Sequence, residues 1–143
     1  MTSRREARRS ALTLLYQWDV TERAPGELYE GEVDEYARGV TDAVVRDVAE
    51  LDRRITDAAA ESGWTAHRLG AVERNILRIA IHELDEGEIP ASAVIDEAVT
   101  LAKQYSTREA GRLVNGLLDR IYRGLEASAA QPPAPGQENG EAA

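Results

Sequence analysis

The chain has 143 residues, a formal net charge of −9, and neither cysteine nor phenylalanine. This length suits one domain, and the lack of cysteine excludes disulfides and thiolate metal sites. No apolar run approaches the roughly 18–20 residues of a membrane span and no signal-peptide pattern follows the start, so we expect a cytoplasmic protein. The acidic total excludes indiscriminate binding to nucleic acid, because repulsion opposes the approach of a polyanion.

The first predicted helix begins at a capping box. Ser3 is the expected N-cap and Glu6 stands at the third helical position. Apolar residues then recur at helical spacing as far as Trp18, and Pro25-Gly26 interrupts the pattern. We therefore expect this helix to end before residue 25.

Four arginines occupy the start of this helix: Arg4, Arg5, Arg8 and Arg9. Positive charge in a first turn opposes the helix dipole, at about 0.3–1 kcal/mol for each exposed charge at low salt. The spacings 4/8 and 5/9 place the four side chains on one broad stripe. This stripe is either a surface that follows a phosphate backbone or a solvated, frayed terminus. If all four are exposed, replacing Arg5, Arg8 and Arg9 with alanine leaves the helix intact.

The middle of the chain is also helical by its apolar spacing. Residues 33–55 predict one long helix, or two with a bend near Asp47, and Gly63 ends this segment. Thr65 can cap a short turn. A strongly amphipathic helix then runs from Gly70 to Gly87.

Two further helices complete the predicted domain. Pro90 stands near the start of the first, and a second capping box from Ser106 to Glu109 opens the last. No convincing alternating strand pattern appears, so we expect an all-α domain over residues 1–127. Residues 128–143 contain no branched aliphatic, aromatic or basic side chain, and we expect them to form a disordered acidic tail.

The chain offers little catalytic chemistry. His82 and Glu83 begin a zinc-protease pattern, but Glu86 stands where the second histidine must be. There is no glycine-rich phosphate loop and no nucleophile elbow. We therefore predict no catalytic residue, no metal site, no cofactor and no enzyme activity. With only seven aromatic residues, a surface platform for base stacking is also not expected.

Two local patterns leave alternatives open. The acids Glu83, Asp85, Glu86 and Glu88 form either a soluble loop or a docking patch for a basic protein.

The second pattern is Asn115-Gly116, a turn dipeptide inside a helical apolar period. A mid-helix glycine costs about 1 kcal/mol relative to alanine, so something must approach Gly116 closely. That is either a neighbouring helix or a nucleotide contacted by the Asn115 amide.

Four blocks in this order resemble the NusB family of bacterial transcription antitermination factors. After the arginine-rich start they are ALTLLYQ at 11–17, VERNILRIA at 72–80, IDEAVTLAK at 95–103 and LVNGLLD at 113–119. Each block alone is weak, but together they span roughly residues 4–125. Three positions depart from the usual family residues: Asp96 replaces asparagine, Thr100 replaces glutamate, and Leu113 replaces phenylalanine.

The resemblance implies six to seven helices in two packed subdomains. It also implies binding to single-stranded boxA RNA together with NusE, a small-subunit ribosomal protein, within the RNA polymerase antitermination complex of ribosomal RNA operons. By the family pattern the RNA path follows the arginine-rich helix and Asn115-Gly116. Glu73 matches a glutamate that faces NusE, and Glu83 is a second candidate for partner binding.

Two alternatives remain beside this hypothesis. One is a helical homodimer whose Gly116 face packs on a second copy. The other is a detached NusB-like domain of the kind that precedes certain RNA methyltransferases, for which the chain carries no catalytic region.

Overall fold

The computed structural model describes residues 3–29 and 31–130, and this part of the chain contains helices and no strand. Seven α-helices and two 3-10 turns follow one another: α1 (Arg4–Thr21), α2 (Pro25–Leu28), α3 (Glu35–Arg46), α4 (Val48–Ala58), η1 (Ala60–Ser62), η2 (Ala66–Arg68), α5 (Ala71–Glu86), α6 (Ala91–Tyr105) and α7 (Arg108–Ala130). The predicted all-α fold is confirmed.

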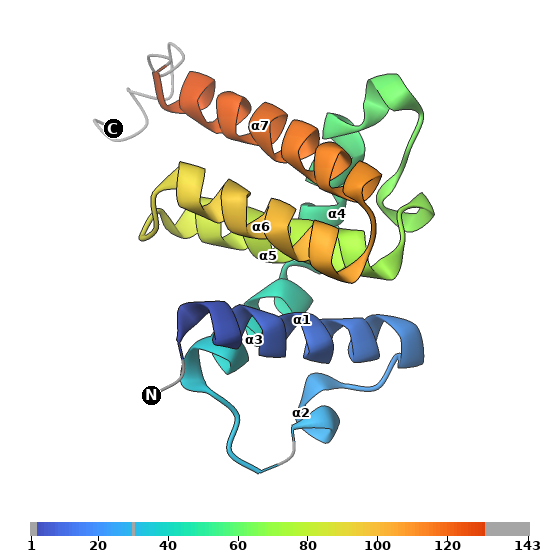
Figure 1. The fold of residues 1–143 in the computed structure, drawn as a ribbon, viewed down its shortest axis with the longest axis vertical. Helices are drawn as coiled ribbons and strands as arrows, with labels where there is room; N and C mark the ends of the chain where they lie inside the picture. Colours follow the sequence, from blue (N-terminus) through green and yellow to red (C-terminus); the bar gives the residue numbers. More distant parts are fainter. Residues whose placement is uncertain (1–2, 30, 131–143) are drawn as a thin grey trace, which may run out of the picture.

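The helices form two packed groups (Figure 1). Helices α1, α2 and α3 make one group, and α4 to α7 make the other. Helix α5 lies between them and packs against α1, α3, α4, α6 and α7. The core is aliphatic and contains fully buried Leu15, Ile55, Ile76, Leu77 and Leu118, which suits a chain without phenylalanine. None of the described helices combines the length and apolar character needed to cross a bilayer.

Most helix ends lie where the sequence predicts them. The hydroxyl oxygen of Ser3 accepts a hydrogen bond from the backbone N–H of Glu6 at 3.1 Å and so caps α1. Asp47 separates α3 from α4, as expected for two helices with a bend. Gly63 and Gly87 both adopt a left-handed conformation, with φ of 76° and 70°, which ends the segments before them.

Helix α1 ends at Thr21, before residue 25 as expected, and Pro25 begins the short helix α2, because proline is well suited to the first helical position. Two other expected boundaries need correction. Thr107 caps α7 in place of Ser106, since its Oγ1 accepts from the N–H of Ala110 at 3.0 Å. Helix α7 continues through Ala130, so residues 128–130 are helical. The rest of the expected tail lies outside the described residues.

The close approach expected at Gly116 occurs instead at Gly111. A Cβ atom built on Gly111 would lie 2.8 Å from Cγ of Lys103, where α6 meets α7. At Gly116 the same construction meets nothing within 4 Å. The expectation that a neighbouring helix of this chain packs on Gly116 is therefore wrong.

Charged residues join α1 to α5 near the carboxyl end of α1. Oδ2 of Asp19 accepts hydrogen bonds from Arg74 at 2.9 Å, Asn75 at 3.0 Å and Arg78 at 3.0 Å. Arg78 also donates to both carboxylate oxygens of Asp52 on α4, at 2.7 Å each. This network ties three helices together, and it explains why polar residues interrupt the apolar face of α5.

Candidate nucleic-acid interface

Two of the four arginines on α1 are exposed to solvent. Arg4 is exposed and its guanidinium carbon lies 4.5 Å from the centre of the Tyr36 ring. The Arg5 side chain is 64% exposed, and its Nε lies 3.3 Å from Oε1 of Glu97. That carboxylate oxygen is buried and receives no hydrogen bond, so the contact is ionic and loosely oriented. Arg4 can turn toward a polyanion without breaking an ion pair, whereas Arg5 can do so only by leaving the buried Glu97 carboxylate.

Arg8 has a different place, and the expectation that it is exposed is wrong. Only 8% of the residue is accessible. Its Nε donates to both carboxylate oxygens of Glu83 on α5, at 2.8 and 2.9 Å. The sequence spacing places Arg8 on the same stripe as Arg4, but the stripe is wide enough that its inner edge faces α5. Arg8 therefore holds α1 in position.

Glu83 is buried as well, at 3% exposure. Besides Arg8 it accepts a hydrogen bond from the hydroxyl of Tyr36 on α3. Burial raises the pKa of that tyrosine well above its ordinary value, and the hydrogen bond to Glu83 raises it further. The prediction that Glu83 lies in a surface docking patch is wrong, because its carboxylate is already satisfied inside the molecule.

Arg9 connects α1 to the end of α6. It is partly buried, and its Nη2 donates to the side-chain oxygen of Gln104 at 3.3 Å. Its Nε is buried without a hydrogen-bond partner. This Nε is out of reach of solvent, so a phosphate oxygen would meet the outer end of the guanidinium group, where the contact of Nη2 with Gln104 is long.

Glu73 lies in the first turn of α5 and is partly buried. Its Oε1 accepts a hydrogen bond from the hydroxyl of Ser106, in the turn between α6 and α7. The other carboxylate oxygen lies against Gly70, where an added Cβ would collide with it. Glu73 thus has an internal contact, and one side of the carboxylate remains near the surface.

Asn115 and Gly116 are exposed on α7. The described side chains make no hydrogen bond to the Asn115 amide. Helix α6 separates α7 from α1 (Figure 1), so Asn115 and the arginines of α1 do not form one compact site. A ligand that touches both must be extended and must pass across the end of α6.

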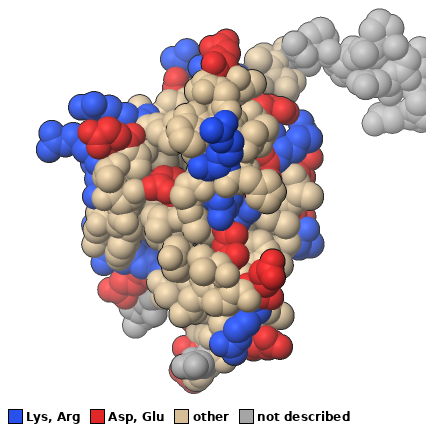
Figure 2. Space-filling view, turned by 90° about the vertical axis from the view of Figure 1, so that its right-hand side faces the viewer, with Lys and Arg blue, Asp and Glu red and all other residues tan. Residues whose placement is uncertain are grey.

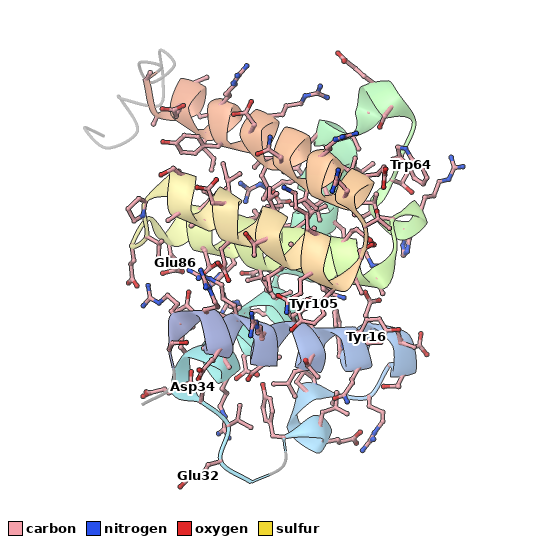
Figure 3. All side chains as sticks on the ribbon, viewed as in Figure 1. Tyr16, Glu32, Asp34, Trp64, Glu86 and Tyr105 are labelled. Atoms are coloured by element: carbon pink, nitrogen blue, oxygen red, sulfur yellow. The ribbon has the colours of Figure 1, made fainter. Side chains whose placement is uncertain are left out.

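The residues along that path include groups that sequence reasoning did not select. Lys103, Gln104 and Tyr105 end α6, and Tyr105 is 47% exposed. Tyr16 on α1 is 42% exposed, and Figure 3 shows both tyrosines on the helices that border this path. Surface aromatics for stacking are therefore present, contrary to our expectation. Helical spacing does identify Tyr16, because it lies one heptad after Arg9.

The surface charge is mixed. Figure 2 shows basic and acidic side chains interspersed over the face that carries the start of α5 and of α7. Many arginines are paired with acids, as with Arg53, which contacts Glu50 at 2.5 Å and Asp57 at 2.7 Å. Ten of the 17 basic residues make an ion pair within the described part of the chain, and the basic groups left for a ligand include Arg4, Lys103 and Arg112. No group of histidine, cysteine and acidic residues suited to a metal ion occurs within the described ranges.

Comparisons of the sequence with known proteins all point to one protein family. The NusB family model matches residues 5–123. The transcription antitermination protein NusB of Solibacter usitatus is 39% identical over 143 residues, which covers 92% of this chain and 97% of that protein. NusB of Aquifex aeolicus is 38% identical and covers 86% of this chain and 89% of that protein.

Solved structures agree. The solution structure of Aquifex aeolicus NusB superimposes with a TM-score of 0.75 at 33% identity, covering 95% of this chain and 97% of that one. A crystal structure of the antitermination factors NusB and NusE in complex with dsRNA matches with a TM-score of 0.74 at 34% identity, covering 85% of this chain and 96% of that one. Sequence and fold together show that this chain belongs to the NusB family.

Proposed function

We propose that this protein is a transcription antitermination factor that binds boxA RNA together with NusE. It then supports processive transcription of ribosomal RNA operons as part of the RNA polymerase antitermination complex. The observation that carries the proposal is the solved relative with the same fold, in which NusB and NusE are in complex with double-stranded RNA. We assign the protein no catalytic activity and place it in the cytoplasm, where nascent transcripts are made.

The RNA contact divides into positioning and recognition. Arg4, Arg5 and Arg9 supply mobile or partly unsatisfied cations for phosphate oxygens. Tyr16 and Tyr105 offer ring faces on which unpaired bases can stack. The Asn115 amide can donate to and accept from a base edge. These groups line one extended path, which suits a single strand because its bases are exposed.

Two features explain why a second protein is required. The chain is acidic overall, so long-range repulsion opposes RNA binding by the isolated protein. Two of the four α1 arginines, Arg5 and Arg8, are also already paired with acids of this chain. A basic partner such as NusE reduces the repulsion and adds phosphate contacts. Glu73 is our candidate for its contact, because one carboxylate oxygen is not used by Ser106.

The test is an RNA-binding titration of Arg5→Ala/Arg9→Ala with and without NusE. Each lost phosphate contact removes about 0.7 from the slope of log affinity against log salt for a single strand, so the double variant should lose about 1.4. Arg23→Ala/Arg53→Ala is the matched control, since both arginines are exposed and paired with acids elsewhere. An unchanged slope in the first variant contradicts the proposed RNA path.

Three further samples separate the alternatives. A scrambled RNA tests the preference for boxA, and a duplex of the same sequence tests the preference for a single strand. Sedimentation with and without NusE tests the homodimer. A persistent homodimer that does not bind RNA would overturn the antitermination proposal.

A further inference from the structure

A groove lies between α3 and the carboxyl end of α5, beside the amino end of α1. It has a volume of about 530 Å³ and is lined by residues of α3, of α5 and of the turn that follows α5. Glu35, Gly39 and Ala43 lie four residues apart on α3 and share one face of that helix. A Cβ built on Gly39 meets nothing within 4 Å, so the groove is open at this point.

The floor of the groove is apolar and rigid. Val40 and Ala43 are buried, and Ile89 is partly buried beside them. Tyr36 and Glu83 complete the floor, and the hydrogen bond between them fixes both side chains. This floor can accept one or two apolar side chains without rearrangement.

The rim is acidic. Glu35, Glu86 and Glu88 are exposed, and none of them makes an ion pair within the described part of the chain. Figure 3 labels Glu86 on the same side of the molecule as Asp34, at the start of α3.

The basic groups around the groove are largely neutralised. Arg46 donates to both carboxylate oxygens of Asp47, at 2.9 and 3.1 Å. Arg8 is paired with Glu83 beneath the floor, whereas Arg4, whose guanidinium carbon lies 4.5 Å from the centre of the Tyr36 ring, makes no ion pair within the described residues. His82 is the remaining titratable group in the lining. The carboxylates of Glu35, Glu86 and Glu88 therefore give the rim a net negative charge.

We propose that this groove docks a short basic segment of a partner protein. The segment places an apolar side chain over Val40 and Ile89, and its lysines or arginines lie beside Glu35, Glu86 and Glu88. Charge complementarity selects a protein segment over RNA, because the rim repels phosphates. The groove borders the start of the proposed RNA path, because Arg4 of α1 lies over Tyr36 in its floor. The rest of that path, across α6 and α7, does not contribute to the groove lining.

The test uses a synthetic amphipathic helical peptide with leucines on one face and lysines on the others. A second peptide has glutamate in place of every lysine, and a third sample is a single-stranded RNA of twelve nucleotides. Binding is followed by NMR, with the amide signals of Gly39, Val40 and Ile89 as reporters. We expect saturable shifts of these signals with the lysine peptide alone, weakened by salt.

The decisive variant is Gly39→Leu, which fills the groove from a helical position with free space. We expect it to weaken the lysine peptide at least tenfold, and Glu86→Lys/Glu88→Lys to do the same. Gly124→Leu is the matched control, because Gly124 is also an exposed helical glycine with nothing within 4 Å.

Three outcomes overturn the proposal: no binding of the lysine peptide, equal binding of the glutamate peptide, or binding that Gly39→Leu leaves unchanged. Displacement of the lysine peptide by the RNA would assign the groove to nucleic acid and overturn it as well. Affinity for boxA RNA is measured on the same variants. If the unmodified protein does not bind boxA RNA, the proposed function fails; if it binds the RNA but not the lysine peptide, only the groove proposal fails.

Discussion

The two ends of α1 carry charges of opposite sign: Arg8 near the amino end is buried, and Asp19 near the carboxyl end is partly buried. Near its amino end, Arg8 of α1 donates to Glu83, close to the carboxyl end of α5. Near its carboxyl end, Asp19 of α1 accepts from Arg74 and Arg78, nearer the amino end of α5. The two helices are antiparallel, and the ion pairs at the two ends have reversed polarity. A shift of α1 along α5 would separate both sets of partners, and a reversed docking would place like charges together, so these contacts favour the observed register and direction.

The two ends also differ in the number of partners that each carboxylate has. Glu83 has one cationic partner and one hydroxyl donor. Asp19 has three donors, and both arginines have other acceptors, such as Asp52 for Arg78. We expect the amino end of α1 to be the more sensitive to a single substitution.

Arg8→Ala should have the largest effect. It leaves the Glu83 carboxylate buried without its cation, and breaking a buried pair in this way costs about 3–5 kcal/mol of unfolding free energy. Urea denaturation of the variant measures this loss. Arg23→Ala removes an exposed arginine that is 57% accessible, and should cost about 1 kcal/mol or less.

A loss below about 1 kcal/mol in Arg8→Ala would mean that Glu83 finds water or another cation. A second variant, Arg8→Met/Glu83→Leu, removes both charges. It should recover part of the stability, because no buried charge then remains.

Asp19→Asn should have the second-largest effect, a loss of about 2 kcal/mol of unfolding free energy. A neutral amide forms weaker hydrogen bonds with Arg74 and Arg78 than a carboxylate does. The other acceptors of these arginines limit the loss. Denaturation of this variant beside Arg8→Ala tests the comparison of the two ends directly. If Asp19→Asn is the more destabilising of the two, the carboxyl end holds the register.

The stability of the carboxyl end of α1 should also depend on pH, because Asp19 is ionised in its contacts with Arg74 and Arg78. Burial raises the pKa of Asp19, but the hydrogen bond from Arg74 and the charge of Arg78 outweigh it, so the pKa is lowered below 3.8. Because the folded pKa lies below the unfolded one, the contribution is complete above about pH 4 and is lost as the pH falls through the folded pKa. Unfolding free energy should fall less steeply below pH 4 in Asp19→Asn. Parallel curves for the two proteins would contradict this.

Much of the fold follows from the sequence. Period-3.6 apolar spacing, glycines with positive φ and capping residues place nearly every helix. The sequence pattern places the cap of α7 one residue too early, because both Ser106 and Thr107 can cap and only the turn from α6 decides between them. The extent of α7 beyond residue 127 does not follow from the sequence, because composition alone does not show where a helix stops.

The site was less predictable, for a reason visible in Arg8 and Arg9. They are adjacent in sequence, yet only Arg8 meets a buried carboxylate, which comes from 75 residues away. The stripe in α1 is set by helix geometry, but whether an arginine faces inward depends on how α5 docks. The exposed Tyr105 also depends on the end of α6 being uncovered.

Substitution of the exposed Gly116 should have the smallest effect on unfolding free energy of the variants considered. Gly116 lies within α7, and a Cβ atom added to it would meet nothing within 4 Å. Gly116→Ala should therefore raise the unfolding free energy by up to about 1 kcal/mol, through helix propensity alone. Gly124→Ala should give a similar gain, because its surroundings are also open.

The affinity for RNA should differ between the Gly116→Ala and Gly124→Ala variants. If the RNA path follows Asn115 and Gly116, a methyl group at 116 weakens RNA affinity while one at 124 does not, although both variants are equally stable. Titrations of the two proteins with the same RNA and NusE measure this difference. Equal affinities would move the RNA away from this part of α7 and confine it to α1 and the end of α6. The arginines of α1 would then supply the contact without help from the Asn-Gly pair.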